Sequence, residues 1–172
     1  YKQGYLCDEF TMAYAALTGK LDIIKYLRKK NIPWSDFTIS WAAEGGHLDV
    51  LKYADEEGCP WSTRVCNYAV MNDNLELLKY VRERGVSWNE MTCAYAAYCG
   101  NLQTLEYLHQ NGCPWNERTA AYAAMGGHLD ILEYVIENGC PISTQAIYEA
   151  KLCRKTEITN YLNKTGSPYS IK

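Results

Sequence analysis

The sequence predicts an all-α protein, a solenoid of about six helix-turn-helix repeats that are each 27 residues long. Three observations predict this fold class. A tyrosine and an alanine recur in steps of 27 residues, and all five prolines fall in one column of the same period. Such self-similarity is typical of repeat proteins, whose stacked repeats bury a continuous core. The tyrosines are Tyr26, Tyr53, Tyr80, Tyr107, Tyr134 and Tyr161, and the alanines are Ala15, Ala42, Ala69, Ala96, Ala123 and Ala150.

Each repeat is expected to open with a helix N-cap. The cap side chains are of types that accept hydrogen bonds from the free N–H groups of a first helical turn. An acidic residue often follows the cap, and its charge suits the positive end of the helix dipole. A first helix of about nine residues should start here. The cap column reads Asp8, Ser35, Ser62, Asn89, Asn116 and Ser143.

A glycine turn should end the first helix, as at Gly126-Gly127. The second helix then starts near His128 and ends at Gly139, which can adopt the left-handed conformation that terminates helices. Cys140-Pro141 turns the chain into the next cap. A pair of short helices cannot bury its apolar stripes alone, so we expect the pairs to stack.

The period divides residues 1–172 into a single array. The last repeat should be a cap, because Glu149, Lys151, Thr156 and Thr159 stand where earlier repeats carry an aromatic residue, Ala or Leu. Residues 1–6 resemble the tail of a preceding repeat, which predicts that the chain is part of a longer one. The repeats are expected at residues 7–33, 34–60, 61–87, 88–114 and 115–141, with the capping repeat at residues 142–168.

Two aromatic columns are interpreted as packing between repeats. Trp34, Trp61, Trp88 and Trp115 should seal the space between neighbours at the turns. The tyrosines should pack between repeats, with each hydroxyl at the rim or bonded to backbone. A ladder of tyrosines that stacks on a ligand is the alternative interpretation of the tyrosine column.

Residues 38–51, TISWAAEGGHLDVL, resemble the helix-turn-helix of ankyrin repeats, with a double alanine and a Gly-His turn. Residues 126–132, GGHLDIL, repeat the pattern, and the resemblance covers essentially the whole chain. Ankyrin repeats have about 33 residues. The repeats here are shorter, which implies an ankyrin-like solenoid whose hairpin fingers are reduced to tight turns. Short repeats with Gly-Cys-Pro-Trp turns are similar to those of large DNA viruses and some protists.

A partner is expected on the first helices, at columns that vary between repeats and remain exposed. Three columns vary most, and a strip of Leu, Met and Tyr near the helix ends would be larger than a monomer usually exposes. Alternatively, these side chains fold onto the neighbouring helix. The predicted partner-binding residues are Phe37, Glu44, Arg64, Met71, Met91, Tyr98, Arg118 and Met125. A further variable column reads Ala13, Ser40, Asn67, Ala94, Ala121 and Tyr148.

We therefore expect a non-catalytic scaffold that binds a partner protein through the exposed face of the first helices. The alternative is a structural building block of a filament, coat or virion, which self-associates through its uncapped N-terminal end. A net charge of -3 and the lack of an apolar run of about 18 residues predict neither a nucleic-acid nor a membrane partner. No phosphate-binding glycine loop, nucleophile elbow or zinc motif is present, so we expect no cofactor, metal or enzymatic activity.

The eight cysteines are expected to be reduced and buried. Helices of neighbouring repeats pack about 8–10 Å apart, whereas a disulfide needs Cα atoms about 4.4–6.8 Å apart. Cysteines that share a column therefore should not pair. Reduced cysteines predict an intracellular, cytoplasmic protein, although the glycosylation sequon at residues 163–165 indicates the opposite.

A cluster of positive charge occurs once, in the first repeat. One interpretation is charge pairing with acidic residues of the next repeat, at under about 1 kcal/mol for each pair. The other is a site for an acidic or phosphate ligand. The basic residues are Lys20, Lys25, Arg28, Lys29 and Lys30, and the acidic residues are Asp49, Asp55, Glu56 and Glu57.

Overall fold

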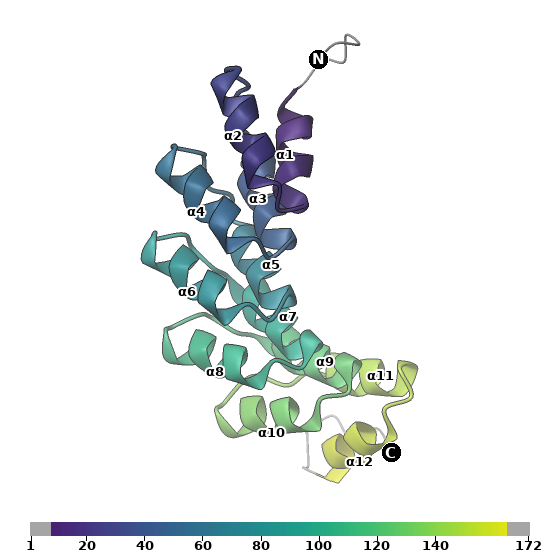
Figure 1. Cartoon of the computed structure of the whole chain (residues 1–172). Coiled ribbons are helices and arrows are strands. Elements are labelled where there is room, and N and C mark those ends of the chain that lie inside the picture. The colour runs from purple at the N-terminus through teal and green to yellow at the C-terminus, as the bar shows by residue number, and fades with distance from the viewer. Residues whose placement is uncertain (1–7, 165–172) are drawn as a thin grey trace. The chain divides into compact units, whose positions relative to one another are not determined.

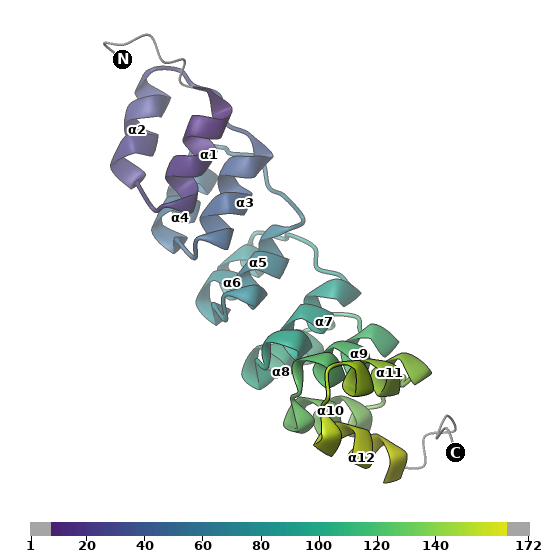
Figure 2. The ribbon, with the colours of Figure 1, turned by 90° about the vertical axis from the view of Figure 1, so that its right-hand side faces the viewer.

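The computed structural model describes residues 8–164, which form twelve α-helices and no strand (Figures 1 and 2). The predicted fold class is confirmed. The prediction for residues 1–6 lies outside the described range, as does the end of the proposed capping repeat. The helices are α1 (Glu9–Leu17), α2 (Leu21–Lys29), α3 (Asp36–Glu44), α4 (Leu48–Glu56), α5 (Val65–Met71), α6 (Leu75–Glu83), α7 (Glu90–Cys99), α8 (Leu102–Gln110), α9 (Glu117–Gly126), α10 (Leu129–Glu137), α11 (Thr144–Leu152) and α12 (Thr156–Lys164).

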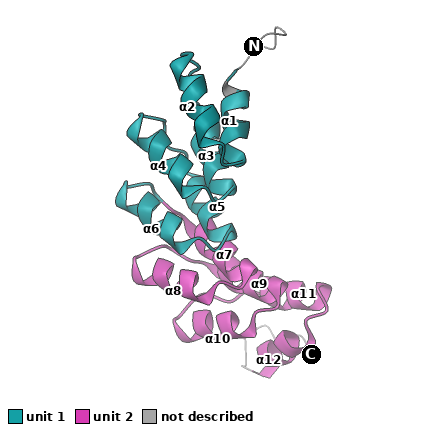
Figure 3. Cartoon of the chain, in the orientation of Figure 1, with its two compact units in different colours: residues 1–87 teal, residues 88–172 magenta. Residues whose placement is uncertain are grey.

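The chain divides into two compact units, residues 1–87 and residues 88–172 (Figure 3). In the first unit, α1, α3 and α5 are the first helices of three hairpins and pack side by side. In the second unit, α7, α9 and α11 do the same. Each second helix packs on the first helix of its own hairpin. Each hairpin lies within one of the 27-residue ranges that the sequence predicts.

The alanine column lies at the centre of both units. Ala42 and Ala69 in the first unit and Ala96, Ala123 and Ala150 in the second are fully buried. A small side chain at this position lets neighbouring first helices approach closely, and larger apolar residues on the second helices fill the remaining core. Alanine therefore recurs because the space between helices admits nothing larger.

Cap geometry explains where most first helices begin. The Asp8 side chain accepts a hydrogen bond from the Thr11 N–H, and the Thr11 side chain accepts one from the Asp8 N–H, which together form a capping box. Asn89 and Thr92 form the same capping box at the start of α7. The prediction that Ser62 is an N-cap is wrong, because α5 begins three residues later, at Val65. Val65 has no hydroxyl that could accept a hydrogen bond from the Ser62 N–H, so a capping box cannot form at this position.

The glycine turns bring neighbouring hairpins into close contact. A Cβ atom at Gly126 would lie 2.5 Å from the Tyr98 carbonyl oxygen, so no side chain fits at this position. His128 Nε2 lies 3.1 Å from the same oxygen and bridges the two hairpins. In the first unit Asn72 makes an equivalent bridge, because its side-chain amide donates to the Ala43 carbonyl at 3.0 Å.

Trp34, Trp88 and Trp115 each pack against the tyrosine of their own repeat. The rings of Trp34 and Tyr53 are 6.3 Å apart, as are those of Trp115 and Tyr134. The sequence predicts each tyrosine hydroxyl at the rim or bonded to backbone, whereas two of the hydroxyls bond to side chains. The Tyr80 hydroxyl donates to Asp55 at 2.7 Å, and the Tyr134 hydroxyl lies 3.1 Å from His109 Nδ1. Both partners are side chains of the preceding repeat.

All cysteines of the described residues are free thiols. Five of them are buried, whereas Cys153 is exposed. No group of three metal-ligating side chains occurs between residues 8 and 164. In the same range, no helix is both long and apolar enough to cross a bilayer. The buried cysteines are Cys59, Cys66, Cys93, Cys113 and Cys140.

Candidate partner-binding surface

Most of the predicted partner-binding residues are open to solvent. The exposed ones in the first unit are Phe37 and Glu44 on α3, Arg64 just before α5, and Met71 on α5. In the second unit, Tyr98 on α7 and Arg118 on α9 are exposed, whereas Met91 and Met125 are half-buried. Both units thus present part of the predicted set on their first helices.

A column of aromatic residues lies between the two predicted columns and is missing from the prediction. Positions i, i+4 and i+7 of a helix share one face, so Trp41 lies with Phe37 and Glu44. Tyr95 lies with Met91 and Tyr98 in the same way. We call these three columns the first-helix stripe of each unit. The added column consists of Tyr14, Trp41, Tyr68, Tyr95 and Tyr122.

In the first unit, aromatic rings join two neighbouring first helices. The ring centroids of Phe10 on α1 and Phe37 on α3 are 5.8 Å apart, and those of Phe37 and Trp41 are 6.3 Å apart. Phe10 and Tyr14 remain 51% and 63% exposed. The rings therefore support one another while their outer faces stay in water.

In the second unit, Tyr122 on α9 is the centre of the stripe. Its ring centroid lies 6.3 Å from that of Tyr95 and 6.2 Å from that of Tyr98. The Arg118 guanidinium donates to the Met91 Sδ atom at 3.5 Å. These contacts hold the side chains across α7 and α9 in one arrangement.

The third variable column does not belong to the surface. Ala13 and Ser40 are buried in the first unit, and Ala94 and Ala121 are buried in the second. The expectation that this column remains exposed is wrong, because it faces the neighbouring first helix. Asn67 is half-buried, and Tyr148 is 60% exposed, since it lies on the last first helix of its unit.

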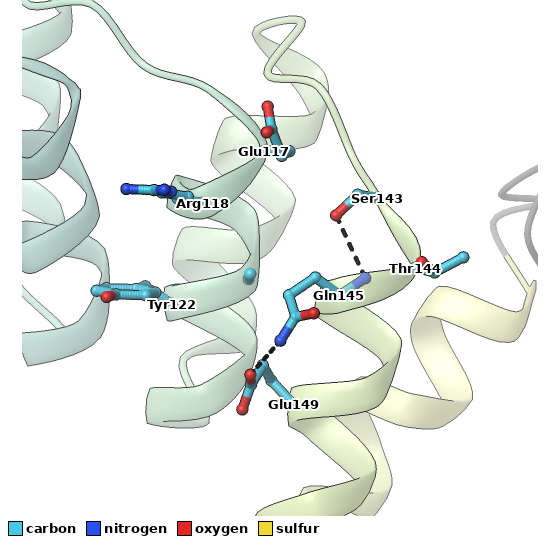
Figure 4. Close-up of a pocket in the computed structure, with 8 residues that line it drawn as sticks. Glu117, Arg118, Tyr122, Ser143, Thr144, Gln145 and Glu149 are labelled. Atoms are coloured by element: carbon cyan, nitrogen blue, oxygen red, sulfur yellow. Dashed lines mark hydrogen bonds between the residues drawn. The ribbon is translucent and has the colours of Figure 1, made fainter.

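A polar groove runs beside the stripe between α9 and α11, with a volume of about 520 Å³ (Figure 4). Arg118 and Tyr122 extend from α9 on the side away from α11. The Gln145 amide donates to the Glu149 carboxylate across one turn of α11. Glu117 lines the same groove, so the carboxylates of Glu117 and Glu149 can accept hydrogen bonds from a partner.

The charge pairing predicted for the basic cluster is replaced by contacts with aromatic rings. The Lys25 ammonium lies 5.4 Å from the centre of the Tyr53 ring, and the Arg28 guanidinium lies 4.6 Å from that of Trp34. The acidic residue Asp55 instead pairs with Arg84, at 2.8 Å between Oδ2 and Nε.

Comparison with known proteins agrees with this architecture. The family model described as ankyrin repeats (3 copies) matches residues 66–146. The crystal structure of the human ASB11 ankyrin repeat domain is similar at a TM-score of 0.69 and 15% sequence identity. The match covers 91% of this chain and 83% of that one. No curated protein matches the chain.

Proposed function

Because this chain is an ankyrin-repeat protein, we propose that it is a non-catalytic scaffold that binds a partner protein through the first-helix stripe. Ankyrin repeats generally mediate protein–protein interaction, and their fold is typically not catalytic. The observation that carries the proposal is the exposure of large apolar side chains on the first helices. Phe10, Met71 and Tyr98 are between 45% and 51% exposed although each neighbours a packed helix.

The composition of the stripe supports this proposal. Aromatic residues, Met and Arg are enriched in the centres of protein interfaces and supply most residues with large binding energies. The outer columns change from repeat to repeat, from Phe37 to Arg64 and from Glu44 to Met71. Because these side chains differ between repeats, each repeat can contact a different residue of the partner. The buried free thiols support a reducing, cytoplasmic location.

The proposal is tested with Tyr98→Glu and Met125→Glu in the full chain. A partner captured from cell extract is identified, purified and titrated against each variant. We expect each substitution to weaken binding more than tenfold, because a carboxylate would be buried against the partner. The matched controls are Gln103→Glu and Gln110→Glu, which add the same charge to exposed positions of α8.

The controls should bind as tightly as the wild-type chain. If the stripe variants retain their partners, the binding surface lies elsewhere and the proposal is wrong. If they retain every partner but lose self-association, the protein is a structural building block instead.

One observation favours this second candidate function. Ile23 on α2 is 47% exposed, whereas Val50 and Leu77, the equivalent residues of the next two repeats, are fully buried. An unburied Ile favours association with another surface. Sedimentation velocity at two concentrations tests this. Self-association through α2 predicts a larger species at high concentration that Ile23→Glu removes and Gln103→Glu retains.

A further inference from the structure

A small cavity lies on the second-helix side of the first unit, between α2 and α4. It has a volume of about 380 Å³ and is lined by Lys25, Arg28, Lys29, Tyr53 and Glu57. None of these residues belongs to the first-helix stripe. We propose that the cavity binds one phosphoryl group, carried by a side chain of a protein partner.

Arg28 is held in place before any ligand arrives. Its Nη1 atom donates to the Ile32 carbonyl at 2.6 Å, and its guanidinium lies over the Trp34 ring. Its Nε atom is buried and has no hydrogen-bond partner in the described part of the chain. A guanidinium that is fixed in this way loses little conformational entropy when it binds an anion.

Two lysines complete the positive lining. Lys25 and Lys29 are one helical turn apart on α2, so their side chains are neighbours. Within residues 8–164, no carboxylate forms an ion pair with Lys25, Arg28 or Lys29. Glu57 is the one carboxylate in the lining. Three cations therefore face a single anion, which leaves positive charge for a ligand.

Tyr53 supplies a hydroxyl donor beside the three cations. Burial raises the pKa of Tyr53, and the nearby Glu57 carboxylate raises it further, against the opposing effect of Arg28. The hydroxyl therefore keeps its proton at neutral pH. A phosphoryl dianion has three oxygens that accept charge-assisted hydrogen bonds, which matches this set of donors.

All three cations occur together only in the first repeat. The equivalent three positions hold Lys52, Asp55 and Glu56 in the second repeat. In the third repeat they hold a lysine, an arginine and a glutamate, and in the fourth a glutamate, a histidine and a glutamine. The complete set of three cations on α2 is therefore the feature that fits an anionic ligand.

The neighbouring charges favour a single phosphoryl group over an extended polyanion. Asp49 and Glu56 are exposed on α4, and Glu57 lines the cavity itself. A nucleic acid or an anionic membrane that extended from α2 over α4 would meet all three carboxylates. One phosphoryl group in the cavity meets only Glu57.

The test measures the binding of the full chain to the peptide acetyl-Gly-Ala-phosphoserine-Ala-Gly-amide by NMR titration. At constant ionic strength, we expect it to bind at least tenfold more tightly than the serine and glutamate versions of the peptide. Lys25→Gln should weaken binding of the phosphopeptide at least threefold, and Arg28→Lys at least tenfold. Lys52→Gln is the matched control, because this ammonium lies at the same 5.4 Å from a tyrosine ring but does not line the cavity.

Three outcomes would overturn the proposal. The first is equal affinity for the phosphoserine and serine peptides. The second is an equal loss in Lys25→Gln and Lys52→Gln. The third is tighter binding of inorganic phosphate, or of vesicles that contain phosphatidylserine, than of the phosphopeptide.

Tyr98→Glu should leave phosphopeptide binding unchanged, so this result is independent of the partner proposed for the stripe. Because Lys25 is exposed, its variant remains informative even if Arg28→Lys does not fold.

Discussion

Thr92 and Thr119 occupy the same column of the second unit, and the side chains of both are buried. The Thr92 hydroxyl accepts a hydrogen bond from the Asn89 N–H at 3.3 Å, whereas that of Thr119 has no partner within the described residues. A buried hydroxyl without a partner costs free energy that a methyl group of the same shape does not. The same residue type therefore stabilises one helix start and weakens another.

Valine in place of each threonine separates these two effects. We expect Thr92→Val to lower the free energy of unfolding by about 1 kcal/mol, because it removes the capping box. Thr119→Val should leave the stability unchanged or raise it. Urea denaturation of both variants checks the prediction. Equal losses would show that the Thr119 hydroxyl has a partner after all.

Cys140 makes stability depend on pH in the alkaline range. Burial raises the pKa of this thiol from 9.0 to about 12, and its Sγ donates to the Asn116 carbonyl at 3.2 Å. Above pH 9 the unfolded chain loses the thiol proton while the folded chain keeps it. The free energy of unfolding should therefore fall as pH rises toward 12.

Cys140→Ala should reduce this loss. Between pH 7.5 and 10.5 we expect the wild-type chain to lose about 1–2 kcal/mol more stability than the variant. Cys153→Ala is the control, because that thiol is exposed. Equal pH dependence of wild type and Cys140→Ala in urea denaturation would contradict the assignment.

At the scale of helices, α4 and α6 are joined through one carboxylate. Asp55 accepts hydrogen bonds from the Trp61 indole at 3.0 Å and from the Tyr80 hydroxyl, and it pairs with Arg84. The Arg84 Nη2 atom also donates to the Tyr80 hydroxyl at 3.1 Å. Each partner of Asp55 belongs to the following repeat, so this one side chain fixes the contact between two hairpins.

Loss of Asp55 should therefore cost far more than loss of another acid on α4. We expect Asp55→Ala to lower the free energy of unfolding by about 2–4 kcal/mol, because hydrogen bonds to charged groups contribute about 1.5–3 kcal/mol. Asp49→Ala is the control at an exposed position of the same helix and should change stability by less than about 0.5 kcal/mol. Similar losses for both variants, measured by urea denaturation, would show that the network adds nothing.

The helices were predictable from the sequence because caps, glycines and apolar residues recur together. The late start of α5 could not have been read from Val65, because Ala146 also breaks the threonine column and α11 still begins directly after Ser143. Part of the stripe was missed for a different reason. Trp41 and Tyr95 belong to a nearly invariant column, and only helical geometry reveals that they share a face with variable residues.

At the scale of the whole molecule, the contacts inside each unit are local, because each hairpin packs on its neighbours within the same unit. Stability in such an array is close to a sum of repeat and nearest-neighbour contributions. The period predicted this arrangement. It could not predict the division at residue 87, since the columns continue across that position without a break.

Leu51 and Leu132 test how far a local change spreads. They are fully buried residues of the same column, one in each unit. Leucine to alanine at a buried site costs about 2–5 kcal/mol. We expect Leu132→Ala to speed hydrogen exchange in α9, α10 and the helices that follow, while α1 to α4 remain protected.

Leu51→Ala should produce the mirror image of this pattern, with faster exchange in α3 and α4 and little change in α10 and α12. Hydrogen exchange followed by mass spectrometry resolves both patterns. Uniform acceleration along the chain in either variant would show a single cooperative unit instead.

Three of the tryptophans at the turns each meet a different residue of the repeat before them. Trp34 lies under a guanidinium, Trp61 donates to the carboxylate of Asp55, and Trp115 stacks on His109 at 3.8 Å between ring centroids. If the order of these repeats were changed by protein engineering, a tryptophan would face the wrong partner residue in the preceding repeat, although every tryptophan kept its position. To duplicate or exchange a repeat without losing this contact, the partner residue in the adjacent repeat must be changed as well.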